Sequence, residues 1–154
     1  MSNPTAVVFA TGDKAEDSGG SGFKVLVEAS RGDGVLKAEI VRVISGYPAG
    51  GVFTKAKKLG IPFTHSPKGR TEDDYKRLIG ESRAEWVILS GWMDRIKGHD
   101  PKRTINIHPA YDLVRYGGQG FFGHHVHDAV WRDFLEGTTL YAGVSMHFAT
   151  SGYD

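Results

Sequence analysis

Short apolar runs alternate with amphipathic segments along most of this chain. Six runs have the length and turn-like flanks of strands: residues 5–10, 38–44, 62–65, 85–90, 104–108 and 141–148. Helical spacing of apolar residues falls between them, at residues 23–29, 52–59 and 125–135 and in a segment that follows Thr71. Thr71 precedes three acidic residues, which is typical of a helix N-terminus. This order predicts an α/β fold with an open, mostly parallel sheet and helices on both faces.

Length and composition limit the classes of protein to which this chain can belong. The 154 residues contain no evident linker or repeat, so we expect one domain over residues 1–154. The net charge of +1 comes from interspersed charges, which gives no reason to expect nucleic acid as a partner. The chain has no cysteine, which excludes disulfides and thiolate chemistry. Because no long apolar run or signal-like N-terminus is present, we expect a cytoplasmic protein without membrane contact.

The end of the fifth predicted strand carries the clearest candidate chemistry. Asn106 and His108 are two residues apart, so their side chains point to the same side of a strand. An uncharged amide N–H and a protonatable ring suit an oxyanion that develops during acyl transfer. Asn and His also occur in turns before a proline such as Pro109, so the tetrapeptide by itself is not specific.

A glycine-rich turn follows the first predicted strand. Residues 18–22 read Ser-Gly-Gly-Ser-Gly and precede a predicted helix, whose free N–H groups could bind a phosphate. The spacing matches neither a dinucleotide fingerprint nor a P-loop. The alternative is a flexible surface loop. Residues 11–17, just before the turn, form a polar, acidic segment whose carboxylates we expect to point into solvent.

Two further segments could line a ligand site. Residues 89–96 leave the fourth strand with aromatic and apolar side chains that could form a pocket wall or simply belong to the core. Residues 115–127 hold many glycines, two phenylalanines and three histidines. His125 and His127 point in different directions on a helix and lack a carboxylate pair, so we expect a mobile cover and no metal site.

The last residue, Asp154, becomes informative only if the chain folds back toward His108. A carboxylate beside an imidazole raises the pKa of the ring and keeps it protonated. Protonation is the state that a hydrogen-bond donor to an oxyanion requires.

Taken together, these motifs resemble the phosphoribosylglycinamide formyltransferase family over nearly the whole chain. The matching segments are Asn106–Pro109, residues 43–49 and 56–62, residues 89–96, residues 116–130 and residues 144–148. The resemblance implies a Rossmann-like formyltransferase fold. It also implies transfer of a formyl group from 10-formyltetrahydrofolate, a cosubstrate, to the amine of phosphoribosylglycinamide in purine biosynthesis, without a metal.

The resemblance implies a role for each matching position. Asn106 and His108 would hold the tetrahedral intermediate, with His108 as general acid and Asp154 raising its pKa. Three residues would bind the substrate phosphate: Gly20, Ser21 and Gly22. Five would bind the folate: Arg70, Met93, Asp94, Arg95 and Ile96.

The chain also departs from the family. Gly22 and Gly46 stand where the family usually has asparagine, and relatives continue beyond Asp154 with a further strand and helices. Alternatives are therefore a sugar N-formyltransferase, a 10-formyltetrahydrofolate hydrolase of the same fold, or a non-catalytic ligand-binding remnant. Partners are expected to be small molecules, with a monomer or a homodimer that supplies the lost elements.

Overall fold

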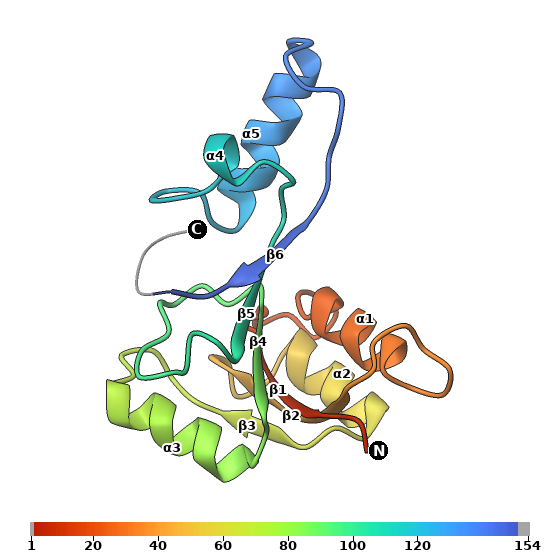
Figure 1. Ribbon diagram of the computed structural model, residues 1–154, viewed down its shortest axis with the longest axis vertical. Helices are drawn as coiled ribbons and strands as arrows, with labels where there is room; N and C mark the ends of the chain where they lie inside the picture. The colour runs from red at the N-terminus through yellow and green to blue at the C-terminus, as the bar shows by residue number, and fades with distance from the viewer. Residues whose placement is uncertain (1, 151–154) are drawn as a thin grey trace.

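A six-stranded sheet forms the centre of the computed structural model, which describes residues 2–150 (Figure 1). Its strand order is β3-β2-β1-β4-β5-β6. The strands are β1 (Thr5–Phe9), β2 (Glu39–Ser45), β3 (Phe63–His65), β4 (Trp86–Ser90), β5 (Thr104–His108) and β6 (Ser145–Phe148). The strands from β3 to β5 pair in parallel and β6 pairs antiparallel with β5. The predicted open, mostly parallel α/β sheet is confirmed.

Helices cover both faces of this sheet. They are α1 (Ser21–Ala29), α2 (Gly51–Leu59), α3 (Glu72–Ser82), α4 (Leu113–Tyr116) and α5 (His124–Leu135). Alternate residues of β1 divide between two cores: Ala6 and Val8 pack with α1 and α2, whereas Val7 and Phe9 pack with α3. This alternation follows from the two-residue period of a strand.

Most element boundaries lie within two residues of those that the sequence predicts. Thr71 forms a capping box with Asp74, which confirms it as the N-cap of α3. The sequence-based prediction was wrong about the start of the last strand and missed one helix. The last strand is regular only over Ser145–Phe148, and α4 was not predicted because it is a single turn, capped by the Asp112 side chain.

The chain reverses direction across the sheet between β1 and β4. Connections from β1 lead outward to β2 and β3, and the next strand, β4, lies on the other side of β1. At such a switch point the loops that follow neighbouring strands separate and leave a crevice at their carboxyl ends. The glycine-rich turn after β1 and residues 91–96 after β4 both begin there.

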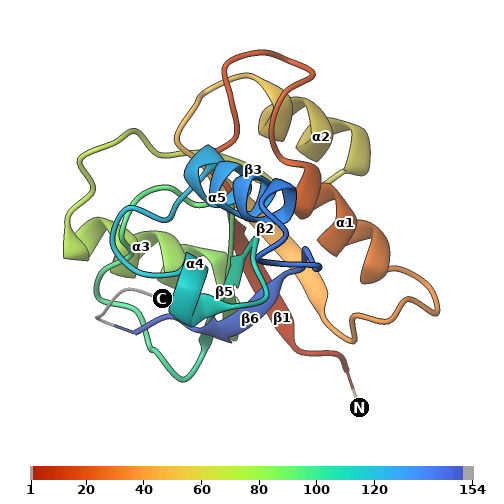
Figure 2. The same cartoon turned by 90° about the horizontal axis from the view of Figure 1, so that it is seen from above.

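Residues 109–144 make an excursion from the sheet that contains α4 and α5. The excursion leaves after His108 and returns at Ser145, and these two residues are register partners in the β5–β6 ladder. It has its own small core of Ala110, Tyr116, Val126, Ala129 and Val130, with Phe121 packed against it. Figures 1 and 2 show α4 and α5 above the carboxyl end of β5.

Among the described residues, no helix has the length and apolar character to cross a membrane.

Candidate functional site

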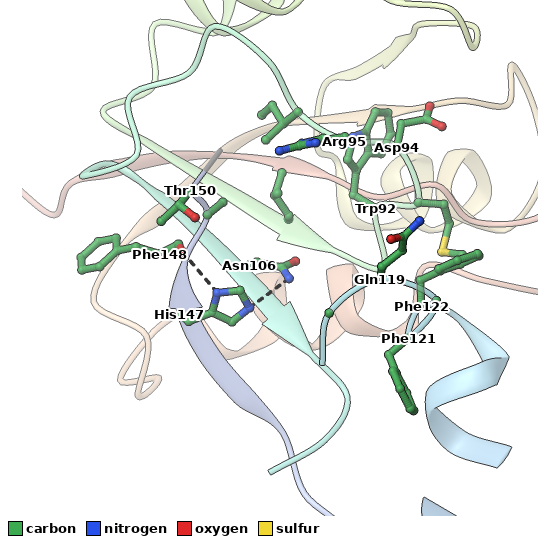
Figure 3. Close-up of a pocket in the computed structure, with 16 residues that line it drawn as sticks. Trp92, Asp94, Arg95, Asn106, Gln119, Phe121, Phe122, His147, Phe148 and Thr150 are labelled. Atoms are coloured by element: carbon green, nitrogen blue, oxygen red, sulfur yellow. Dashed lines mark hydrogen bonds between the residues drawn. The ribbon is translucent and has the colours of Figure 1, made fainter. Parts of the chain in front are cut away.

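Asn106 is held by a neighbouring strand. Its register partner on β6 is His147, and its amide nitrogen lies 3.2 Å from His147 Nε2 (Figure 3). His147 Nδ1 lies 3.2 Å from the carbonyl oxygen of Phe148. A carbonyl oxygen can only accept, so Nδ1 carries hydrogen and Nε2 is the acceptor for the Asn106 amide. This arrangement fixes which end of the amide faces β6.

His147 is a site residue that the sequence-based prediction missed. The sequence places it on the last strand, but nothing in the sequence gives the pairing partner of that strand. An antiparallel partner for β5 would have pointed to His147, because residues directly opposite each other in a ladder have close side chains.

His108 ends β5 and is almost completely buried, with 3% of its surface exposed. Its Nε2 lies 2.7 Å from the carbonyl oxygen of Tyr116, the last residue of α4. Asn106 and His108 both line one cavity, at the carboxyl end of β5. The structure therefore brings together the two residues that the sequence pairs by spacing.

Two neighbouring cavities meet at Asn106. The first, of about 380 Å³, is the aromatic cavity, and most of its wall comes from residues 92–96, 118–122 and 147–150 (Figure 3). The second, of about 420 Å³, is the glycine cavity, bounded by residues 19–22, His108 and residues 121–124. The residues shared by both walls are Trp92, Met93, Asn106, Phe121 and Phe122.

The glycine cavity has the start of α1 in its wall. Gly20 is the N-cap, with a φ of +71°, and α1 begins at Ser21. A Cβ atom placed on Gly22 would lie 2.4 Å from the Ser90 hydroxyl oxygen, so a side chain here would require Ser90 to move. An asparagine, which the resembled family usually has at this position, would meet the same hydroxyl unless Ser90 turned away.

The acidic segment before this turn points outward as expected. Asp13, Glu16 and Asp17 are all exposed. A hydrogen bond from the Ala15 backbone N–H, followed by one from the Ser18 hydroxyl, lowers the pKa of Asp13. These carboxylates therefore do not crowd the glycine cavity.

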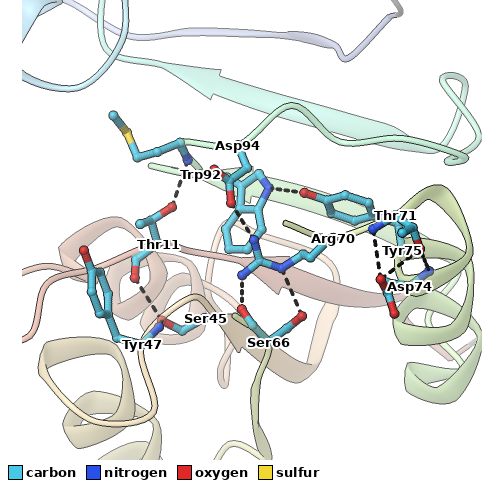
Figure 4. Close-up of polar contacts among 11 residues, drawn as sticks. Thr11, Ser45, Tyr47, Ser66, Arg70, Thr71, Asp74, Tyr75, Trp92 and Asp94 are labelled. Atoms are coloured by element: carbon cyan, nitrogen blue, oxygen red, sulfur yellow. Dashed lines mark hydrogen bonds and ion pairs between the residues drawn. The ribbon is translucent and has the colours of Figure 1, made fainter. Parts of the chain in front are cut away.

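Four of the five predicted folate-binding residues lie together. Met93, Asp94, Arg95 and Ile96 line the aromatic cavity. Thr11, just after β1, holds this segment by accepting a hydrogen bond from the Met93 N–H at 2.8 Å (Figure 4).

Arg70 lies apart from those four. Its side chain is 2% exposed, pairs with Asp94 and lies 4.4 Å from the centre of the Trp92 ring (Figure 4). It also donates to the Ser66 hydroxyl and the Ser66 carbonyl. Arg70 is not among the described residues that line either cavity, so in this structure it supports Asp94 and Trp92 from behind.

The glycine-rich loop and the histidines lie over both cavities. Residues 118–122 line the aromatic cavity, while His124 and His127 line the glycine cavity. Within residues 2–150 no group of three acidic or histidine side chains is arranged to hold a metal ion. The predicted partner of His108, Asp154, lies outside the described residues.

Comparisons with known proteins agree with the sequence motifs. The chain is 31% identical over 147 residues to the chloroplastic phosphoribosylglycinamide formyltransferase of Arabidopsis thaliana, matching 88% of this chain and 48% of the relative. The chain thus spans about half the length of the curated relatives that it matches. No protein-family model matches it.

Solved structures have the same fold. Glycinamide ribonucleotide transformylase 1 of Symbiobacterium toebii superposes with a TM-score of 0.75 at 22% identity, covering 99% of this chain and 68% of that one. The phosphoribosylglycinamide formyltransferase of Streptococcus pneumoniae gives a TM-score of 0.71 at 26% identity, covering 99% and 76%. These likenesses confirm the resemblance found in the sequence and the fold that it implied.

Proposed function

We propose that this chain transfers a formyl group from 10-formyltetrahydrofolate to the primary amine of phosphoribosylglycinamide. The observation that carries the proposal is the place of Asn106, which lies in the shared wall of two neighbouring cavities of different chemistry. A donor group at that junction can contact an atom that passes from one ligand to the other. The names of the similar proteins support this reaction over other acyl transfers.

The glycine cavity is proposed to bind the acceptor. The first turn of α1 offers backbone N–H groups that have no partner within the helix, and Ser21 adds a hydroxyl. These are groups that bind a phosphate. His108 lies in the same wall, so an acceptor bound by its phosphate can extend its amine toward β5.

The aromatic cavity is proposed to bind the folate. Trp92, Phe121 and Phe148 give it flat apolar walls, and Asp94 and Arg95 add charged groups that can pair with polar edges. A planar heteroaromatic ring fits this combination. Arg70 is proposed to act on the folate indirectly, by holding Asp94 in place.

The proposed chemistry uses the two β5 side chains together. As the amine nitrogen bonds to the formyl carbon, the electron pair of the carbonyl bond moves to the oxygen, and Asn106 and protonated His108 donate hydrogen bonds to it. The bond from carbon to the folate nitrogen then breaks. That nitrogen gains one proton and the amine loses one, so the proton count balances. Asp154 is proposed to keep His108 protonated.

A formyl-transfer assay with purified chain and both substrates tests the proposal. Loss of one oxyanion donor lowers turnover by about 10²–10³-fold in other enzymes, so Asn106→Ala should fall by that amount. Asn3→Ala is the matched control, because Asn3 is an exposed asparagine near the N-terminus. Equal activity of the two variants, or a folded chain that formylates no acceptor, would refute the proposal. Formate release without acceptor would support the hydrolase alternative instead.

A further inference from the structure

The His108 ring has a hydrogen bond that fixes one of its protons. Nε2 lies 2.7 Å from the Tyr116 carbonyl oxygen, in a buried setting. Because this oxygen only accepts, Nε2 carries hydrogen in both the neutral and the charged ring. The proton that the ring gains and loses is therefore the one on Nδ1.

Side chains of the excursion hold the Tyr116 side chain. The Tyr116 hydroxyl donates to Asp133 Oδ2 at 2.8 Å, and Arg115 Nη2 lies 2.7 Å from the same oxygen. Arg115 also donates to the carbonyl and the hydroxyl of Thr138, at 3.2 and 2.9 Å. Tyr116 and Asp133 are both buried, whereas Arg115 and Thr138 are exposed, so the hydrogen bond between Tyr116 and Asp133 is the part of this cluster that is shielded from water.

The Tyr116 hydroxyl remains a donor at neutral pH. Burial, and then the hydrogen bond to Asp133, raises the pKa of this hydroxyl above its ordinary value. Edge-to-face contacts with Tyr111 and Phe121 further fix the ring, with centroids 6.4 and 6.5 Å away. These contacts hold the Tyr116 side chain, and the hydrogen bond between His108 and the Tyr116 carbonyl links the end of α4 to β5.

We infer that Asp133, although it lines neither cavity among the described residues, is a positioning residue for His108. Asp133 on α5 holds Tyr116, the Tyr116 carbonyl holds Nε2–H, and this assigns the exchangeable proton to Nδ1. The inference rests on the proposed function only where it has the Nδ1 proton of His108 act as an acid in formyl transfer. The tautomer itself is a property of the folded chain.

Nitrogen NMR of the full chain labelled with ¹⁵N-histidine tests the inference. At alkaline pH, the neutral ring of His108 should carry its hydrogen on Nε2. A His108→Asn variant assigns its signals. One buried hydrogen bond contributes about 0.5–1.5 kcal/mol, so Tyr116→Phe and Asp133→Asn should lower the ratio of Nε2–H to Nδ1–H by about twofold to thirteenfold.

Tyr75→Phe is the matched control. Tyr75 is an equally buried tyrosine whose hydroxyl accepts from Trp92 Nε1 at 3.3 Å, away from His108, so its removal should leave the tautomer ratio unchanged. The inference is overturned if wild-type His108 carries its hydrogen on Nδ1, a result that needs no folded variant. It is also overturned if both folded variants keep the wild-type ratio. The expected ratios in a chain without formyl transfer would support the positioning role and reject the proposed function.

Discussion

Gly22 and His147 illustrate what single residues contribute at the β5 site. Gly22 has no Cβ atom, and the Ser90 hydroxyl lies close to where a Cβ atom would be placed. His147 orients the Asn106 amide. The Phe148 carbonyl sets the tautomer of the His147 ring, and this tautomer leaves Nε2 as an acceptor, so the amide nitrogen of Asn106 faces β6. Neither property follows from residue identity alone, since each depends on a neighbour from another strand.

At Gly22 we predict that Gly22→Ala weakens binding of the phosphate-bearing substrate, seen as a raised KM, with little net change in stability, because the Ser90 hydroxyl can rotate away and alanine favours the α1 helix. The new Cβ would lie 2.4 Å from the Ser90 hydroxyl oxygen but 3.8 Å from Ser90 Cβ. Gly22→Ala combined with Ser90→Ala should therefore recover most of the lost binding. Steady-state kinetics and chemical denaturation measure both effects, and a double variant as impaired as the single one would contradict the steric explanation.

At the scale of elements, the sequence predicts what depends on local pattern. Strand alternation, the Thr71 cap and the glycine-rich turn are local, and all appear where expected. Two features could not be predicted because they depend on pairing between distant residues. These are the pairing of β6 with β5, which makes His147 a site residue, and the ion pair that turns Arg70 away from the cavity. The short helix α4 was missed for a local reason. A one-turn helix has no periodicity to detect.

For α3, we predict a cap whose contribution depends on pH. Hydrogen bonds from the Thr71 backbone and then from its hydroxyl lower the pKa of Asp74. A carboxyl whose pKa is lower in the folded state adds stability above its unfolded pKa and loses it as pH falls through the folded value. Asp74→Asn should thus lower the melting temperature at pH 7, and the difference should shrink below about pH 4.

The exposed Glu81 offers a control for that measurement. It also lies on α3 and pairs with Arg77 at 3.4 Å on the helix surface. Glu81→Gln should change the melting temperature little at either pH, because exposed pairs of this kind contribute about 0.3–0.5 kcal/mol. A pH-independent effect of Asp74→Asn would show that the capping hydrogen bonds do not depend on charge.

At the scale of the whole molecule, apolar side chains gather on the excursion and the edge strand. Exposed members are Trp131, Phe134, Leu135, Leu140, Tyr141, Val144, Met146 and Phe148. β6 is also the edge of the six-stranded sheet that the described residues form. An exposed apolar edge strand favours pairing with another chain.

We therefore predict that the chain self-associates with rising concentration and that Met146→Lys weakens this association. Met146 is 65% exposed on β6, so a lysine there fits the monomer and disfavours edge pairing. Val35→Lys is the matched control, since Val35 is 90% exposed in a loop away from the edge. Sedimentation velocity over a concentration series measures both variants. A monomer at every concentration, or an equal effect of the two lysines, would contradict the prediction.

The pairing of His108 with Ser145 has a consequence for engineering. The excursion leaves and rejoins the sheet at facing backbone positions. A change in its length therefore does not require a change in the register of the six strands. Residues can be inserted or exchanged around the exposed turn at Gly137 without changing any strand pair. The region between these two anchor points is thus a natural place to graft a foreign segment while keeping the β-sheet scaffold.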